Sequence, residues 1–191
     1  MVIIFMRLLI LSFTSGMLSY LSVSLPHFLG SRFAVSDDML FFLPGVLFAL
    51  FVLLPLVNKT KYRVLRWFGL LAFSLAAWYM AVTIGIQMLP LVKQSPILSC
   101  AVGGSIGVLV LAAASRYLVP VKFKTASILT AITVGFIGGC LIGMAVKQPR
   151  ASMASETFYF IGFLFWHCSV AVSLFGRLQY TNKNKQMNDT E

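Results

Sequence analysis

The sequence predicts an all-α fold, an integral membrane helical bundle. Of the 191 residues, 59% are hydrophobic and only 10% are charged, whereas roughly a quarter of the residues of a soluble domain are charged. The apolar residues come in long blocks, which short basic or proline-containing segments separate. A helix needs roughly 20 mostly apolar residues to cross a bilayer. We therefore expect a single multi-pass membrane domain over residues 1–179.

Six apolar blocks have the length and composition of transmembrane helices. They cover residues 8–25, 39–57, 65–89, 97–118, 125–146 and 157–176. A proline or a lysine lies close to the end of each of the first five blocks, and neither residue favours continuation of an apolar helix in lipid. After the sixth block, residues 180–191 have almost no apolar content, and we expect them to form a disordered polar cytoplasmic tail.

The first apolar block allows a second interpretation. Arg7 followed by an apolar and serine-rich stretch resembles a secretory signal peptide, and Ser22 or Ser24 is small enough for a cleavage site. The block has no Ala-x-Ala motif, however, and it is long enough to span a bilayer. We expect six transmembrane helices, with five and an external amino terminus as the alternative if this first block is a cleaved signal.

The lysines and arginines predict the orientation, because cytoplasmic loops of membrane proteins carry an excess of them. Four lie on one side of the predicted membrane: Arg32, Lys93, Lys147 and Arg150. Eleven lie on the other: Arg7, Lys59, Lys61, Arg63, Arg66, Arg116, Lys122, Lys124, Arg177, Lys183 and Lys185. The second side also holds both chain ends. We therefore expect both termini to be cytoplasmic, and the short loops suggest a bacterial inner membrane.

Small residues recur at helical spacing in several of the predicted spans. In the first span, Ser12, Ser15, Ser19 and Ser22 share one narrow face. Glycines in the fourth and fifth spans form similar stripes, and small residues let the backbones of membrane helices approach closely. We expect five glycines to act in helix packing: Gly103, Gly107, Gly135, Gly139 and Gly143.

Four polar residues within the predicted spans are candidates for a ligand or cavity site. Tyr79, Thr83 and Gln87 follow one another at four-residue intervals, so they share a face of the third span. His167 lies near the middle of the sixth span, and histidine can change its charge near neutral pH. The alternative for all four is that they form hydrogen bonds between helices. The acidic residues lie instead in loops, near a span end or in the tail: Asp37, Asp38, Glu156, Asp189 and Glu191.

Several other kinds of site are not expected. Cys100, Cys140 and Cys168 all lie within apolar blocks and form no Cys-x-x-Cys pair. His27 and His167 are far apart and lack carboxylates at ligand spacing, so we expect neither a metal nor a cofactor. The net charge of +10 follows from the basic loops, so nucleic acid is not an expected partner.

The absence of catalytic motifs favours a protein that is not an enzyme. The sequence has no Gly-x-Ser-x-Gly, no His-Glu-x-x-His and no carboxylate pair within a span. We expect translocation of a small or amphipathic solute, with an accessory or assembly subunit of a larger membrane complex as the alternative. A membrane-embedded enzyme is the least favoured of the three. The expected partners are the lipid bilayer and either further copies of this chain or other membrane proteins.

Overall fold

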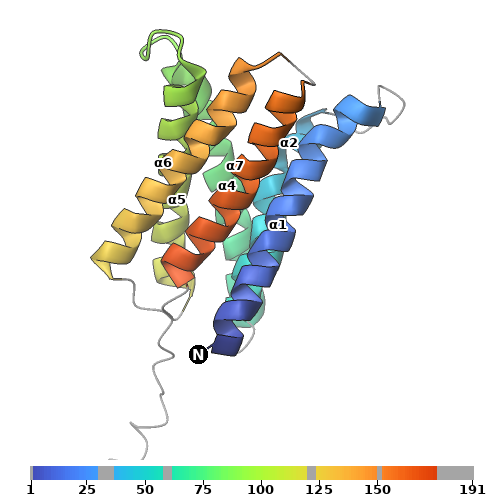
Figure 1. Ribbon diagram of the computed structural model, residues 1–191. Coiled ribbons are helices and arrows are strands. Elements are labelled where there is room, and N and C mark those ends of the chain that lie inside the picture. Colours follow the sequence, from blue (N-terminus) through green and yellow to red (C-terminus); the bar gives the residue numbers. More distant parts are fainter. Residues whose placement is uncertain (1, 30–36, 58–61, 120–123, 150–151, 176–191) are drawn as a thin grey trace, which may run out of the picture.

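All elements in the described part of the chain are helices, which confirms the predicted all-α fold. The computed structural model describes residues 2–29, 37–57, 62–119, 124–149 and 152–175 (Figure 1). The helices are α1 (Val2–Leu29), α2 (Asp37–Phe48), the π-helix η2 (Ala49–Leu53), α3 (Leu54–Val57), α4 (Arg63–Met88), α5 (Pro96–Leu118), α6 (Thr125–Lys147) and α7 (Met153–Phe175). The predicted tail over residues 180–191 lies outside the described residues.

Five of the helices are long and apolar enough to cross a membrane: α1, α4, α5, α6 and α7. The remaining predicted span corresponds to the consecutive helices α2, η2 and α3, whose apolar part is shorter, Phe42–Val57. The multi-pass architecture is therefore supported by five helices, and the count of six stays a prediction.

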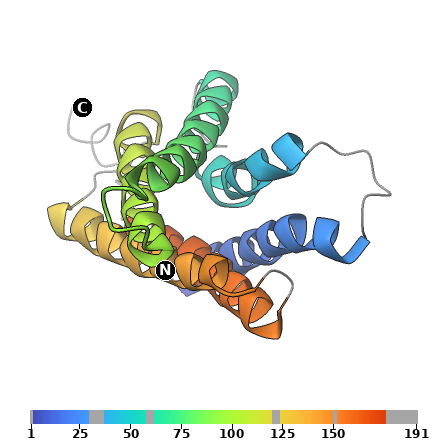
Figure 2. The ribbon, with the colours of Figure 1, turned by 90° about the horizontal axis from the view of Figure 1, so that it is seen from above.

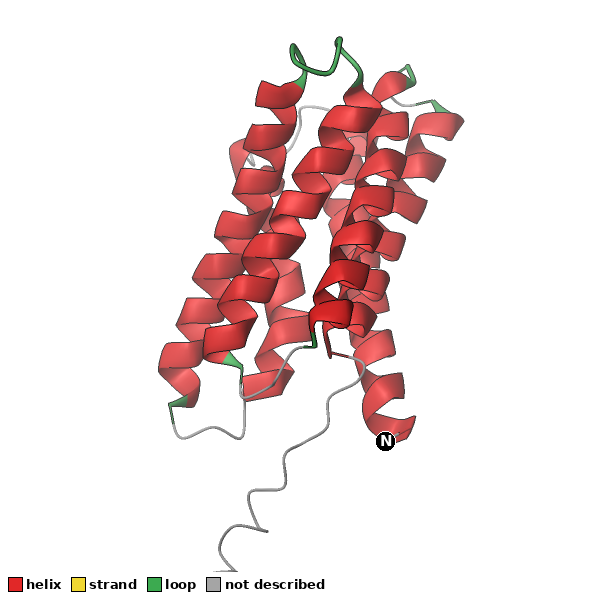
Figure 3. Cartoon of the chain, turned by 90° about the vertical axis from the view of Figure 1, so that its left-hand side faces the viewer, coloured by secondary structure: helices red, strands yellow, loops and turns green. Residues whose placement is uncertain are grey.

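The helices form a closed ring in which sequence neighbours lie side by side. Contacts join α1 to α2, α2 to α4, α4 to α5, α5 to α6, α6 to α7, and α7 back to α1 (Figures 1 and 2). Because the chain reverses at every connection, α1, α4 and α6 begin at the same end of the bundle (Figure 1), the end at which Figure 3 marks the N-terminus. We call this the N-terminal end and the opposite one, where α7 begins, the Glu156 end. Helix α7 ends at the N-terminal end.

Two prolines explain the irregular helix between α1 and α4. Pro44 lies inside α2, and Pro55 is the second residue of α3, the short helix that follows η2. Proline has no backbone N–H and its ring clashes with the preceding turn, so it disturbs the α-helical hydrogen-bond pattern. Here the N–H of Leu54 donates to the carbonyl of Ala49, five residues earlier, which is the π-helical pattern.

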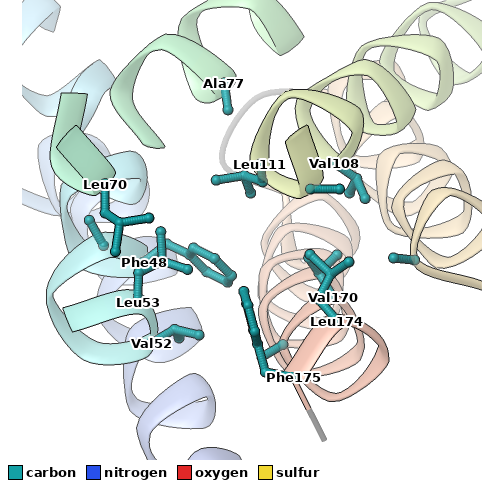
Figure 4. Close-up of a cluster of buried hydrophobic side chains, with 14 of the residues drawn as sticks. Phe48, Val52, Leu53, Leu70, Ala77, Val108, Leu111, Val170, Leu174 and Phe175 are labelled. Atoms are coloured by element: carbon teal, nitrogen blue, oxygen red, sulfur yellow. The ribbon is translucent and has the colours of Figure 1, made fainter. Parts of the chain in front are cut away.

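Large apolar side chains fill the half of the ring nearest the N-terminal end. We call this group the apolar core: Phe48, Val52, Leu53, Leu70, Val108, Leu111, Val170, Leu174 and Phe175. These residues come from four sides of the ring, and Phe48 and Phe175 point toward each other in the middle of it (Figure 4). These side chains pack against one another as a protein interior does, and the buried Ser115 of α5 lies in the same half of the bundle.

The glycines lie where helices pass closest to one another. A Cβ on Gly103 would overlap the carbonyl oxygen of Ala81 in α4, and one on Gly139 would overlap that of Cys100 in α5. A Cβ on Gly143 would lie 2.5 Å from the Cα of Ile97. All five glycines that the sequence assigns to packing are buried at the contacts of α5 with α4 or α6.

Serine hydroxyls add hydrogen bonds between neighbouring helices. The hydroxyl of Ser74 in α4 donates to the carbonyl of Gly45 in α2 over 2.7 Å, and Ser155 in α7 donates to Ala145 in α6 over 3.1 Å. Ser99 in α5 donates to the carbonyl of Gly85 in α4. These bonds pair buried hydroxyls that lipid could not solvate.

Candidate functional site

The serine face of α1 is turned into the bundle, against α7. Four serines on this face are buried, Ser12, Ser15, Ser19 and Ser22, and Ser24 is buried on the side of α1 that also carries Gly16 and Tyr20. Gly16 allows the close approach, because a Cβ there would lie 3.1 Å from the Cα of Leu164 in α7. The Tyr20 and Phe160 rings meet edge to face one turn further along. The repeat of small residues at helical spacing thus places a row of hydroxyl groups at a helix–helix contact.

His167 is the most deeply buried polar residue that faces this row. Its exposed fraction is 0%, and its Nδ1 lies 2.9 Å from the Oγ of Ser15. The rings of Phe48, Trp166 and Phe163 surround the imidazole, with centroid distances of 5.2, 5.4 and 6.3 Å. The imidazole therefore joins α1 to α7 and at the same time borders the apolar core through Phe48.

Two polar atoms in this region have no hydrogen-bond partner. Among the described residues, the buried side-chain atoms without a partner are Ser19 Oγ, His167 Nε2 and Ser115 Oγ. Ser115 belongs to the last turns of α5, whereas Ser19 lies one turn from Ser15 on the same face of α1. An unpaired buried polar group costs about 1–3 kcal/mol, and such groups are rare in native proteins. Ser19 Oγ and His167 Nε2 belong to α1 and α7, the two helices that the Ser15–His167 hydrogen bond joins.

The row of polar groups continues toward the Glu156 end. Ser22 donates to the carbonyl of Ser19 over 2.7 Å, and Ser24 donates to the carboxylate of Glu156 over 2.6 Å. Nine residues separate Ser15 from Ser24, a distance of about 14 Å along a helix. We call these residues the polar seam: Ser15, Ser19, Ser22 and Ser24 of α1 with Glu156 and His167 of α7. It runs from the Glu156 end to the middle of the bundle, where the apolar core begins.

On the other side of His167, the neighbouring polar groups are paired. Ser12 donates to the carbonyl of Leu9 over 3.0 Å, and the Cys168 side chain lies beside it. Within the described ranges, no group of three or more histidine, cysteine or acidic side chains is placed to hold a metal ion. The chemistry that the polar seam offers is therefore hydrogen bonding by neutral groups, with one carboxylate at its outer end.

The other predicted cavity residues lie elsewhere. Tyr79 is 51% exposed and its ring stacks on that of Phe42 at 6.1 Å. Gln87 is exposed and Thr83 is half-buried. The buried face of α4 consists instead of Leu70, Ser74, Ala77 and Gly85. The structure thus places Tyr79, Thr83 and Gln87 on the outer side of α4 and does not bring them together with His167.

Helix α4 reaches the site through a residue that the sequence did not single out. The ring of Trp78 lies 5.8 Å from that of Phe163 and 6.4 Å from that of Trp166. Sequence reasoning also missed Glu156 and Phe48 as neighbours of the site. The spacing of the serines in α1 is the signal in the sequence for the polar seam. No known protein family, curated protein or solved structure matches the chain.

Proposed function

We propose that this chain is a membrane-embedded translocator of a small, uncharged or amphipathic solute, with the polar seam as part of its path. The proposal rests on a difference between the two halves of the bundle interior, one of which is more polar than the other. Hydroxyl groups and His167 line the half toward the Glu156 end, and the apolar core closes the other half. Of the three buried polar atoms without a partner among the described residues, Ser19 Oγ and His167 Nε2 belong to the polar seam, and Ser115 Oγ lies in the half with the apolar core.

Such an interior corresponds to one state of a carrier that opens to one side at a time. A solute with a polar group gains hydrogen bonds along the seam and reaches His167, beyond which the apolar core blocks it. Movement to the other side then requires the apolar core to separate. With the orientation that the basic loops predict, the polar seam begins on the outer side of the membrane.

The irregular helix beside the site provides the means for such a movement. Phe48 contacts both His167 and Trp166 and is followed directly by η2. A π-helical segment holds an extra residue per turn, and these segments are frequent at functional sites. Conversion between π- and α-helical bonding in η2 would rotate Phe48 relative to α7 and open the boundary of the apolar core.

The test is uptake by proteoliposomes that contain the purified protein. The vesicles are incubated with a mixture of uncharged and amphipathic metabolites, and their contents are identified by mass spectrometry. We expect at least one solute to enter with the unmodified protein and not with His167→Asn. Asparagine keeps a polar atom near the position of Nδ1, and so the bond to Ser15, but has none at the position of Nε2.

A matched control and a second measurement make the result decisive. Thr130→Ala, whose hydroxyl bonds to its own helix on the exposed face of α6, is expected to leave uptake unchanged. In a background without the native cysteines, Ser19→Cys is expected to react with a membrane-impermeant thiol reagent from the side that also labels Lys93→Cys. Vesicle contents that equal those of protein-free liposomes, together with an unreactive Ser19→Cys, would contradict the proposal.

A second candidate function is that of an accessory subunit, and the outer side of α4 favours it. Tyr79 and Gln87 present polar groups on an exposed face that also carries Phe73 and Ile86. Polar side chains on the outside of a membrane helix can bind a neighbouring helix of another protein. Native mass spectrometry of the complex extracted in mild detergent tests this. If the chain is an accessory subunit, we expect a second, different protein in the complex at a fixed stoichiometry. The Gln87→Leu variant is expected to lose that protein.

A further inference from the structure

The polar seam contains a feature that restricts what kind of molecule it can hold. His167 is completely buried, and one of its two ring nitrogens is already paired with Ser15. The other, Nε2, has no partner among the described residues, and neither has the Oγ of Ser19. We infer that His167 Nε2 is a binding site for the hydroxyl group of an uncharged ligand, with Ser19 as a second polar contact on the same face of α1.

The chemistry of imidazole favours a hydroxyl over other polar groups. When the Ser15 hydroxyl donates to Nδ1, Nε2 carries the proton and needs an acceptor. When Nδ1 carries the proton and donates to Ser15, Nε2 needs a donor. A hydroxyl oxygen can accept a hydrogen bond and its proton can donate one, so it serves either tautomer. The hydroxyl of Ser19 has the same dual capacity and can pair with either group of the ligand.

The surroundings of the imidazole exclude a charged ligand. Its ring contacts are the side chains of Phe48, Phe163 and Trp166, which carry no charge. An unpaired ion in such surroundings costs far more than a hydrogen bond returns. The only carboxylate in the polar seam, Glu156, lies 11 positions away on α7, about 16 Å along a helix, and is itself bonded to Ser24.

An internal contact competes with this assignment. The Phe48 ring meets the imidazole edge to face, at an interplanar angle of 72°, and an N–H group can rest on an aromatic face. That contact is a weak hydrogen bond, and it leaves the Ser19 hydroxyl unpaired. A bound hydroxyl would satisfy Nε2 with a stronger hydrogen bond and could also pair with the Ser19 hydroxyl. The two assignments make opposite predictions for the addition of a ligand.

The hydroxyl can come from two sources, a water molecule or the polar group of an amphipathic solute. The aromatic side chains around His167 favour a solute with an apolar or aromatic body. The identification of that solute as a passenger rests on the proposed function, whereas binding itself does not. Equilibrium binding therefore tests the site even if the chain translocates nothing.

The experiment uses nitrogen NMR of the full chain in lipid nanodiscs. The chain has two histidines, so ¹⁵N-histidine labelling in a His27→Gln background reports on His167 alone. Phenol, which has a hydroxyl on an aromatic ring, is titrated into the sample, and toluene, which lacks the hydroxyl, is the matched probe. We expect phenol to shift the Nε2 resonance with saturation and toluene to leave it in place.

Two serine variants separate binding from folding. Ser19→Ala is expected to raise the dissociation constant for phenol about three- to tenfold, as loss of one hydrogen bond does. Ser12→Ala is the matched control, because Ser12 is equally buried, lies outside the polar seam and bonds to the backbone of its own helix. Its phenol affinity is expected to equal that of the parent.

The outcomes are distinct. A saturable phenol shift supports the site with an amphipathic solute as its ligand. An Nε2 resonance that phenol does not move, but that shows magnetisation exchange with water protons, supports the site with water as its ligand. An Nε2 resonance without a hydrogen-bonded shift, insensitive to both phenol and water, overturns the inference in favour of the contact with Phe48. Binding without uptake in proteoliposomes would refute the proposed function alone.

Discussion

Replacement of Gly139 by alanine tests how closely α5 and α6 must approach. A Cβ at this position would overlap the carbonyl oxygen of Cys100 and would lie 2.8 Å from the Cα of Ala101. Non-bonded carbon atoms prefer a separation of about 3.5–4.0 Å. The two helices must therefore move apart by about 1 Å to admit one methyl group, and the neighbouring contacts along the same helix pair separate with them.

The expected loss of stability follows from that displacement. A gap of roughly 0.5–1 Å removes a quarter to a half of the dispersion energy of each contact, and overpacking of this kind costs about 1–3 kcal/mol. Alanine is the better helix former by about 0.5–1 kcal/mol, which offsets part of the cost. We expect Gly139→Ala to lower the free energy of unfolding by about 1–2 kcal/mol, the difference between these terms.

The measurement is unfolding in mixed micelles with increasing dodecyl sulfate, followed by the fluorescence of the three tryptophans. Gly85→Ala is the matched control. Gly85 is also a buried glycine within a long helix, but the nearest atom to its Cβ would be the Ser99 carbonyl oxygen at 3.6 Å, an ordinary contact. Without a clash to offset the gain in helix propensity, its free energy of unfolding is expected to rise by about 0.5–1 kcal/mol. Equal stability of the two variants would refute the packing argument.

Three further substitutions probe the site and its supports, each measured by the same unfolding assay. Phe48→Ala is expected to cost about 3–5 kcal/mol, since it leaves a cavity between His167 and the apolar core; a loss below 1 kcal/mol would show that η2 can collapse into the space. Ser15→Ala is expected to cost about 1–3 kcal/mol because it leaves His167 Nδ1 unpaired, whereas the adjacent Thr14→Ala, whose hydroxyl bonds to its own helix, should change little. Ser74→Ala removes the bond to Gly45 and is expected to cost about 0.6 kcal/mol; no change would mean that α2 is held on α4 by packing alone.

The structure also changes how the polar residues of the bundle are understood. Helical spacing correctly identifies which residues share a face, as for Tyr79, Thr83 and Gln87 on α4. It does not say whether that face is turned inward, because lipid and protein interior are equally apolar surroundings. In α4, the inward direction belongs to Trp78 and to the stripe from Leu70 to Gly85. In α1, the serine face is the inward one.

The sequence by itself determined the helical membrane architecture. In a bilayer the backbone N–H and C=O groups must form their hydrogen bonds within the protein, and each helix that spans it must be long and apolar. Four of the five glycines that the sequence assigned to helix packing lie where a Cβ would come within 3.0 Å of a neighbouring helix, as does Gly104, which it did not single out. Only the tertiary structure decided which helices are neighbours, that His167 meets Ser15 from a segment 152 positions away, and that Nε2 is left without a partner. Pairing between distant segments depends on how all the faces pack at once, and no local pattern in one helix contains that information.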